Sequence, residues 1–598
     1  MPRIALLLAA VPLVLGTPSA RKPQLDYMLT VDSADLSGVS VALRIRNAPG
    51  QLRLAAHAHP EYDDKYWRHL EGVSAADAGG RALTVSREDS VVWRVTDAPG
   101  DVTVRYRVRF PKEEGQRAAW RPFLAPSGGL VGGPHSFLYV IGLERAPVTV
   151  TLELPRSWRV ATGLAGPATA RTFRSANAHV LVESPMLVGA LSEWRFRAGN
   201  LPHRVFYWRL PDAAPFDTAA LVRGIEGFAS QALAMFRTAP YTEYTFLLQD
   251  GAFGGLEHPN SVTLGTPSAA LARNPHALLR ETAHEFFHTW NLMAITPAEY
   301  RALDHRVQPP VANLWFSEGL TLFYADLLLR RAGLPTEDST RVSHLESLIA
   351  WYLSAPGNAR FSAEAVSRVA YNAGPGSLGD YTASTHLQGE LIGAVLDLLV
   401  RDATDGARSM DDVMRLMYAR FRDRGFTGAD VQAAVEEICS CSAAPVFERS
   451  VRNAGAIDFD RWLAPIGLRV RSAMEPAVDR EGRPAKDLRA WGWEAAGEPY
   501  LRLRVGDPNS VWGKAGLHTN DQIVSIDGRP VRTWSALRSI LTGLAIGDSA
   551  RFVVQRPSGR FETTVVMQGF ERPVVRLEPV AAPSDRQRRL REAWLAAR

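Results

Sequence analysis

Apolar and polar residues alternate along much of the first third of the chain. The stretches 39–45, 102–110 and 148–154 carry Val, Leu, Ile, Tyr or Phe at every second position. This period of two is typical of strands with one face in a core and one face in water. Turns that contain Gly or Pro separate the stretches. The pattern predicts an antiparallel β-sandwich over residues 21–198, without residues of evident catalytic chemistry.

The pattern changes after residue 198. Residues 199–335 mix short apolar strands, such as 244–249, with helical periodicity, and residues 336–468 are mainly helical. Short strands return over 469–576, and a charged tail covers 577–598, with a short amphipathic helix as an interpretation of its end at 588–595. We therefore predict a multidomain α+β protein with domain boundaries at these positions.

The first twenty residues have the organisation of a signal peptide. A positive charge at Arg3 precedes an apolar run over 4–16 and a segment of small residues over 17–20. That run is too short for a stable membrane span, and no later stretch has the roughly 18 apolar residues that a spanning helix needs. We expect an exported protein, periplasmic or secreted, with no transmembrane span in the mature chain. The alternative is an uncleaved anchor.

Charge and cysteine content narrow the possibilities. The formal net charge is only +5 over 598 residues, and no dense basic run lies beside aromatic residues. This composition argues against nucleic acid as a partner. The two cysteines, Cys439 and Cys441, are one residue apart, and a disulfide across one residue is strained. We interpret them as incidental small apolar residues at a helix end; the alternative is a redox or metal pair.

The residues with the clearest chemistry form the pattern H-E-x-x-H at His284, Glu285 and His288. The surrounding run has no Gly or Pro, so we expect a helix, on which residues four apart lie about 5–6 Å from each other. Two imidazoles on one helical face can bind one zinc ion, and Glu285 can act as a general base beside it.

A catalytic zinc site with two histidines needs a third ligand. Glu318 lies in the apolar, aromatic run 314–321, where burying a carboxylate costs several kcal/mol unless it is paired or bound to metal. We predict one zinc ion held by His284, His288 and Glu318. The alternative is that the histidines belong to the core and that Glu318 caps a helix.

The segments 284–291 and 314–321 resemble the glycyl aminopeptidase family of gluzincin metallopeptidases, family sixty-one, which often carries a PDZ domain and is distantly related to the aminopeptidase N group. The resemblance implies a thermolysin-like catalytic region over 199–335. It also implies that the backbone of Gly254 and Gly255 pairs with the substrate, while Glu257 binds its free α-amino group. The alternative for Glu257 is a loop ion pair.

One motif departs from that family. Its members carry Tyr-x-Lys-Gly to stabilise the oxyanion, whereas the matching positions here hold His386, Gln388 and Gly389. His386 can donate a hydrogen bond to an oxyanion. Tyr381 is the substitute candidate, and the third alternative is that neither residue contacts the oxyanion.

The segment 505–531 resembles a bacterial PDZ domain. The resemblance implies that Ala515, Gly516 and Leu517 take part in binding a C-terminal peptide, with a groove-lining helix near 534–544. The alternative is a packing domain with an unused groove.

Together these features predict an exported zinc aminopeptidase that releases small N-terminal residues, Gly or Ala, from peptides with a free N-terminus. The alternatives are a catalytically weak PDZ adaptor that retains the zinc site, and a zinc endopeptidase. Substrate turnover and zinc content separate the three.

Overall fold

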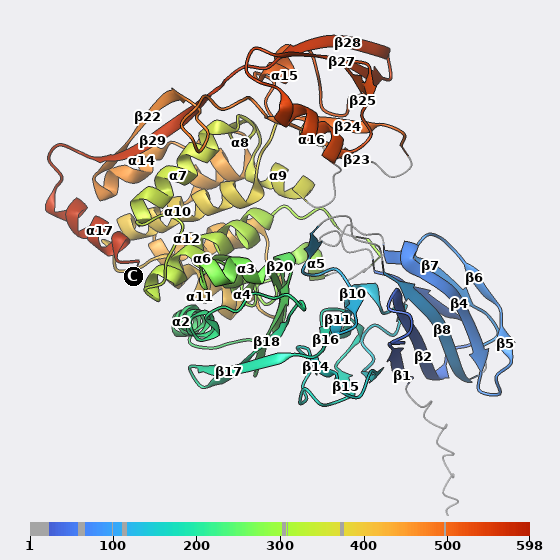
Figure 1. Ribbon diagram of the computed structural model, residues 1–598. Helices are drawn as coiled ribbons and strands as arrows, with labels where there is room; N and C mark the ends of the chain where they lie inside the picture. The colour runs from blue at the N-terminus through green and yellow to red at the C-terminus, as the bar shows by residue number, and fades with distance from the viewer. Residues whose placement is uncertain are drawn as a thin grey trace, which may run out of the picture.

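The computed structural model describes residues 23–597 apart from 58–65, 99, 111–115, 302–305, 308, 371–375 and 495–497. The predicted signal peptide, 1–20, therefore lies outside the described residues. Figure 1 shows a β-rich part at the N-terminus, a central sheet with a helical region, and a smaller mixed part near the C-terminus. The predicted multidomain α+β organisation is confirmed. Among the described helices, none is both long and apolar enough to cross a bilayer.

The N-terminal part packs one seven-stranded sheet against a smaller sheet around a shared apolar core. The order of the larger sheet is β15-β13-β1-β2-β8-β4-β5. These strands are β15 Thr172–Ser175, β13 Val148–Glu153, β1 Gln24–Thr30, β2 Gly38–Ala48, β8 Gly100–Arg109, β4 Leu70–Asp77 and β5 Ala82–Leu83. The prediction of a purely antiparallel arrangement is wrong for one pair, because β1 and β13 run parallel. Alternation alone reports which residues face the core, and parallel and antiparallel pairs can share that pattern.

A second sheet of six strands lies in the central part, in the order β17-β18-β19-β21-β20-β9. Its strands are β17 Ser192–Ala198, β18 Leu201–Trp208, β19 Tyr244–Asp250, β21 Ser261–Thr266, β20 Ala252–His258 and β9 Arg117–Ala118. The short β9 pairs with β20 only at Ala252 and Phe253. The outer edge of β20 over 254–258 therefore has no strand partner among the described residues.

Helices cover this sheet and continue into the helical region. They include α2 Thr218–Phe236, α4 Leu279–Phe287, α6 Leu320–Arg331, α7 Arg341–Ser354, α10 Thr385–Ala403, α11 Met410–Phe421 and α12 Gly428–Cys439. One apolar core extends from the central sheet through all of these helices. The segments 199–335 and 336–468 thus pack as one body, which we call the catalytic body.

The interpretation of the cysteines as incidental is wrong, because Cys439 and Cys441 form a disulfide. Helix α12 ends at Cys439, and Ser440 takes a left-handed conformation, φ 51°. This turn brings the two Cα atoms to 5.1 Å, within the range that a disulfide spans.

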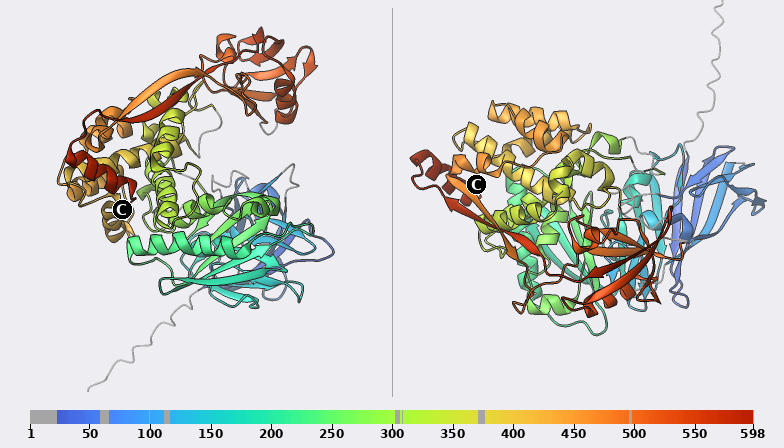
Figure 2. Two further views of the ribbon diagram at one scale, coloured as in Figure 1. Left: turned by 60° about the vertical axis from the view of Figure 1, so that its left-hand side comes forward. Right: turned by 90° about the horizontal axis from the view of Figure 1, so that it is seen from above.

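Residues near the C-terminus form a separate unit on a two-stranded arm. The arm pairs β22 Leu468–Pro476 with β29 Glu571–Pro579 along their full lengths. Between them, residues 477–570 form the C-terminal module, which has its own apolar core. It contains the helices α15 Val511–Lys514 and α16 Trp534–Gly543 and a sheet in the order β23-β24-β25-β27-β28. These strands are β23 Ala490–Glu494, β24 Leu501–Val505, β25 Gln522–Ile526, β27 Ser549–Arg556 and β28 Gly559–Val566. Figure 2 shows the arm leading from the helices to this module.

Candidate metal centre

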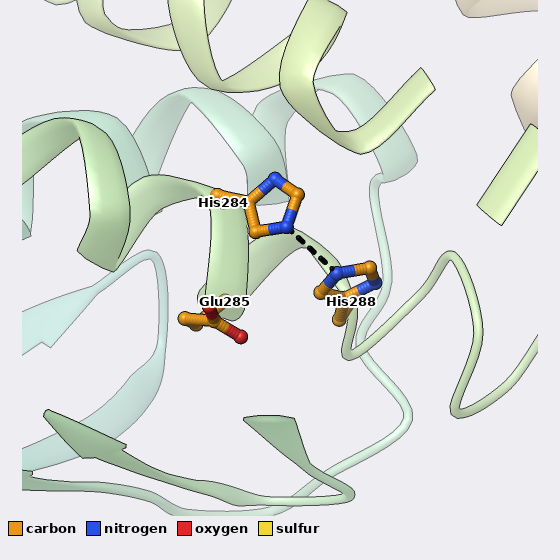
Figure 3. A group of neighbouring side chains, drawn as sticks. All are labelled: His284, Glu285 and His288. Carbon is orange, nitrogen blue, oxygen red and sulfur yellow. Dashed lines mark hydrogen bonds between the residues drawn. The ribbon is translucent and has the colours of Figure 1, made fainter. Parts of the chain in front are cut away.

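Helix α4 and the residue after it bring two histidines together. His284 and Glu285 lie in the last turns of α4, and His288 caps its C-terminus. The Nε2 atoms of the two histidines are 3.1 Å apart, and Figure 3 shows both rings on the same side of the helix. Both residues are buried. The predicted helix and the four-residue spacing account for this approach.

Glu318 reaches the same point from a second element. It lies in a single wide turn of π-helical geometry, Trp315–Gly319, that leads into α6. Its Oε2 atom is 3.3 Å from Nε2 of His288 and 3.6 Å from Nε2 of His284. Turns of this kind are frequent at functional sites because they redirect one side chain out of the regular helical register.

His386 joins these residues from α10. Its Nε2 atom is 3.1 Å from Oε2 of Glu318, while 44% of its side chain stays exposed. We call His284, His288, Glu318 and His386 the His/Glu cluster. The close crossing of two glycines makes the approach possible: a Cβ on Gly389 would lie 1.9 Å from the carbonyl oxygen of Trp315. A Cβ on Gly319 would lie 2.2 Å from the backbone of Gly389.

Hydrogen bonds around the cluster hold the His288 ring and the turn that carries Glu318 in place. Nδ1 of His288 lies 2.9 Å from the backbone oxygen of Asn291, and a carbonyl only accepts, so Nδ1–H donates and Nε2 faces the cluster. The Asn291 side chain donates to the backbone oxygens of Phe316 and Ser317 at 2.9 and 3.0 Å. Asn291 thus ties the loop after α4 to the turn that carries Glu318.

The electrostatics favour a cation inside the cluster. Burial lowers the pKa of His284 to about 4, with a smaller contribution from His288. Burial also disfavours the charged form of His288, but the carboxylates of Glu318 and Glu257 outweigh it and raise that pKa to about 9. Burial opposes ionisation of Glu318, yet His288 and His386 hold its pKa well below the ordinary value. Burial also disfavours the charged form of His386, but Glu318 outweighs it and raises that pKa. The carboxylate of Glu318 therefore favours positive charge on the groups beside it.

The distances in the cluster fit zinc. Ligands at about 2.0–2.1 Å in a tetrahedron are separated by about 3.3 Å. The three separations among His284, His288 and Glu318 are 3.1, 3.3 and 3.6 Å. Two imidazole nitrogens and one carboxylate are also the donor types that catalytic zinc prefers. His386 contacts the Glu318 carboxylate and remains partly exposed.

The Gly-rich strand β20 lies directly against Glu285. A Cβ on Gly255 would be 2.5 Å from Cγ of Glu285, so only glycine leaves room for that carboxylate. Gly254 has φ +76° and lies beside Trp120. The two glycines therefore bring the free edge of β20 to the candidate base, as the predicted substrate-binding role requires.

Glu257 lies on the same face of β20 as Gly255, because side chains two apart in a strand point the same way. It is 5% exposed. Burial raises its pKa, while the charge of His288 acts in the opposite direction. The Glu257 carboxylate thus lies close enough to the cluster to help raise the pKa of His288.

The two candidates for stabilising the oxyanion, His386 and Tyr381, lie in different surroundings. The Tyr381 ring packs against Phe361 and under the guanidinium of Arg360. Of the two candidates, His386 is the one that contacts Glu318. Gln388, at the Lys position of the family motif, donates to the backbone oxygens of Asn358 and Phe361. Its side chain thus links α10 to the backbone of the segment 358–361.

The residues proposed for PDZ peptide binding lie beside β28 Gly559–Val566. Leu517 is fully buried in the module core, and a Cβ on Gly516 would touch Phe561. The carbonyl of Ala515 accepts a hydrogen bond from Thr563. Strand β28 is at the opposite edge of the sheet from β23 Ala490–Glu494, which packs near α16. A peptide-binding role for these three residues stays a prediction.

Sequence reasoning missed Glu281. It is exposed, one helical turn before Glu285, and its carboxylate faces the backbone N–H of Gly255. The four-residue spacing to Glu285 is the sequence signal that could have found it. Asn291, Gly319 and Gly389 were also missed as supporting residues, because their roles depend on contacts between distant segments.

Two family models match the chain. Residues 26–190 match the Peptidase M61 N-terminal domain, and residues 277–392 match the M61 glycyl aminopeptidase. The second match spans α4, the Glu318 turn and His386. The predicted resemblance to family sixty-one is confirmed over these segments, while the PDZ resemblance stays a prediction.

The crystal structure of an aminopeptidase N family protein from Idiomarina loihiensis has the same fold. The TM-score is 0.77 at 22% sequence identity, and the match covers 96% of this chain and 100% of that chain. A mutant M1 zinc metallopeptidase from Deinococcus radiodurans, bound to a Tyr-Ser-Ala substrate, has a TM-score of 0.46 and 17% identity over 72% of this chain and 94% of that chain. The comparison with curated proteins gives no match.

Proposed function

We propose that this protein is a zinc-dependent aminopeptidase. The observation that carries the proposal is the convergence of His284, His288 and Glu318 in one buried cluster, with Glu285 on the same helix. The match of residues 277–392 to the M61 glycyl aminopeptidase model supports the same conclusion.

His284, His288 and Glu318 would hold one zinc ion. Zinc in such a site supplies Lewis acidity, which activates water near neutral pH and polarises a carbonyl. Glu285 takes the proton of the attacking water and later delivers it to the leaving amine. The contact with Gly255 keeps this carboxylate between the helix and the free edge of β20, where an extended peptide would pair.

Glu257 gives the site its preference for a free N-terminus. A peptide on the β20 edge would place its α-ammonium against this buried carboxylate, since a carboxylate is the natural partner of an ammonium. A Glu257→Gln variant is expected to lose most activity on free N-termini through KM.

His386 is the residue that would stabilise the developing oxyanion. It contacts Glu318 and stays partly exposed, so a substrate carbonyl can reach it. Tyr381 has partners elsewhere and is not needed in this scheme.

The test combines metal analysis with turnover of Gly- and Ala-anilides, with and without a chelator. One zinc per chain and chelator-sensitive release of the anilide are expected. Glu285→Gln should retain zinc and lose at least about 10²-fold in kcat, since a general base contributes at least that much. Zinc without turnover would favour an adaptor, and cleavage of blocked peptides alone would favour an endopeptidase.

Two further assignments belong to this proposal. The segment 1–20 supports export to the periplasm or medium, which the N-terminal sequence of the mature protein would test. In the C-terminal module, β23 has a strand partner on one side only among the described residues, and α16 packs near it. A C-terminal peptide added there as a further strand is the PDZ mode of binding.

A further inference from the structure

The C-terminal module touches the catalytic body at the segment that precedes α10. Asp380 of this segment accepts a hydrogen bond from the backbone N–H of Thr519 and another from Nδ1–H of His518, both at 2.6 Å. Two residues later, the backbone N–H and the hydroxyl of Thr382 both donate to the carbonyl oxygen of Gly506 at 3.0 Å. We call these four hydrogen bonds the module contact.

At the module contact, glycines allow the backbone of each part to approach the side chains of the other closely. A Cβ on Gly376 would lie 2.5 Å from the side chain of Thr519, and a Cβ on Gly506 would lie 2.8 Å from Oγ1 of Thr382. Such close packing leaves no room for a layer of water. The module contact is therefore a built interface between the two parts of the chain.

The same segment leads directly into the cluster. Ser384 caps α10, and its own backbone N–H donates to the side chain of Asn358. His386 follows in the first turn of α10, at 3.1 Å from Glu318. Only a few residues therefore separate the module contact from the side chain of His386.

We propose that Asp380 and Thr382 are positioning residues for His386, because the docked C-terminal module holds the first turn of α10 in place through them.

Two features make this coupling effective. The first turn of a helix lacks part of its internal hydrogen bonding, so it depends on external contacts for its position. Asp380 is a charged acceptor with two donors, the stronger type of hydrogen bond, and it is partly shielded from water. The arm also joins the module to the body: its strand β22 is largely exposed, whereas β29 packs against α7.

The expected signature is local and independent of turnover. In Asp380→Ala, the backbone amides of 385–392 should exchange with solvent about tenfold faster, because the turn opens more often. The kcat for an aminoacyl-anilide should fall about tenfold with little change in KM, since a displaced His386 affects the reaction more than binding. Thr382→Val keeps one of the two bonds to Gly506 and should show a smaller change of the same kind.

The matched control is Asp479→Ala. Asp479 also accepts backbone N–H groups and pairs with a side chain, Arg483, but within a turn of the module. This variant should leave both exchange at 385–392 and kcat at the wild-type values. If Asp380→Ala fails to fold, Asp380→Asn provides the same test, since it retains an acceptor for Thr519 but loses the charge.

The route through His386 is tested in a double variant. This step rests on the proposed function, whereas the exchange measurement does not. Adding Asp380→Ala to His386→Ala should cause no further loss of kcat. Unchanged exchange at 385–392 in the single variant would overturn the positioning role, and additive losses of kcat would overturn the route through His386. If exchange is faster in Asp380→Ala but the His386→Ala variant is fully active, the positioning role of Asp380 is retained and the oxyanion role of His386 is overturned.

Discussion

Single residues decide where the candidate base lies, and Gly255 is the clearest case. Its missing Cβ provides the space that Glu285 occupies, since a methyl group there would be 2.5 Å from Cγ. A general base displaced by even 1 Å loses most of its effect.

We therefore predict that Gly255→Ala lowers kcat by about 10- to 100-fold while zinc content stays at the wild-type value. The measurement is anilide hydrolysis together with metal analysis of the same sample. Gly543→Ala is the control, because a Cβ at Gly543 meets no atom within 4 Å. Equal kcat in the two variants would contradict the assigned role of Gly255.

Glu281 leads to a prediction about substrate preference. In the proposed binding mode, a peptide with its N-terminus at Glu257 would continue along β20 toward Gly255, which the Glu281 carboxylate faces. The residue after the released one would therefore meet a negative charge. An exposed ion pair contributes up to about 1 kcal/mol, so Lys should be preferred to Glu at that position by about fivefold in kcat/KM.

The variant Glu281→Gln should remove this preference without loss of zinc. The measurement compares Gly-Lys and Gly-Glu peptides on wild type and variant. Glu337→Gln is the control, since Glu337 pairs with the neighbouring Arg280 on the outer surface. A preference for Lys that survives in Glu281→Gln would show that the charge comes from elsewhere.

Between elements, the crossing of α10 with the Glu318 turn determines the geometry of the cluster. Gly389 approaches the carbonyl oxygen of Trp315, and this contact sets the distance from His386 to Glu318. A backbone atom cannot move aside as a flexible side chain can, so a methyl group there must push the two elements apart.

Gly389→Ala should destabilise the protein by about 1–3 kcal/mol and weaken zinc binding by about tenfold or more. Unfolding by denaturant and competition with a zinc-binding dye measure the two effects. Gly393→Ala, one turn later, is the matched control: its Cβ would meet the side chain of Leu320, which can adjust. Wild-type zinc affinity in Gly389→Ala would show that the crossing of α10 with the Glu318 turn does not determine the geometry of the metal site.

The sequence predicts those parts of the site that a local pattern of residues reveals. The spacing of His284 and His288 is a property of α4 itself, and Glu318 stands out as an acid in an apolar run. It does not predict that Gln388 turns away or that Tyr381 packs on Arg360, because these depend on the loops around α10. The disulfide at Cys439 was missed for a similar reason, since it depends on the left-handed turn at Ser440.

For the whole molecule, the alternating pattern identifies most strands but not how distant segments meet. The charged segment 577–598 contains α17 Asp585–Leu595, the amphipathic helix that its end indicates, and the sequence does not show that this helix packs on the catalytic body. Trp594 is 1% exposed and lies over the guanidinium of Arg341, which also donates to its backbone oxygen. The chain thus leaves the body at β22, forms the C-terminal module and returns to the body.

This return predicts that the end of the chain stabilises the catalytic body. Trp594→Ala should lower the free energy of unfolding by about 3–5 kcal/mol, the usual cost of removing a buried Trp side chain. It also removes the ring that covers the buried Arg341, whose ion pair with Asp397 lies between α7 and α10. Leu595→Ala is the control, because Leu595 is the next residue of the same helix and is 43% exposed.

The thermal unfolding of the two variants is compared by far-UV circular dichroism rather than by tryptophan fluorescence. A large drop in Tm for Trp594→Ala and a small one for Leu595→Ala would place α17 in the cooperative unit of the body. Equal, small changes would mean that α17 unfolds on its own. In the first case, a chain cut after the C-terminal module would lose α17 and with it part of the core, so the module cannot be studied by truncation from the C-terminus. Variants at Asp380 then remain the direct way to release the module while the body stays intact.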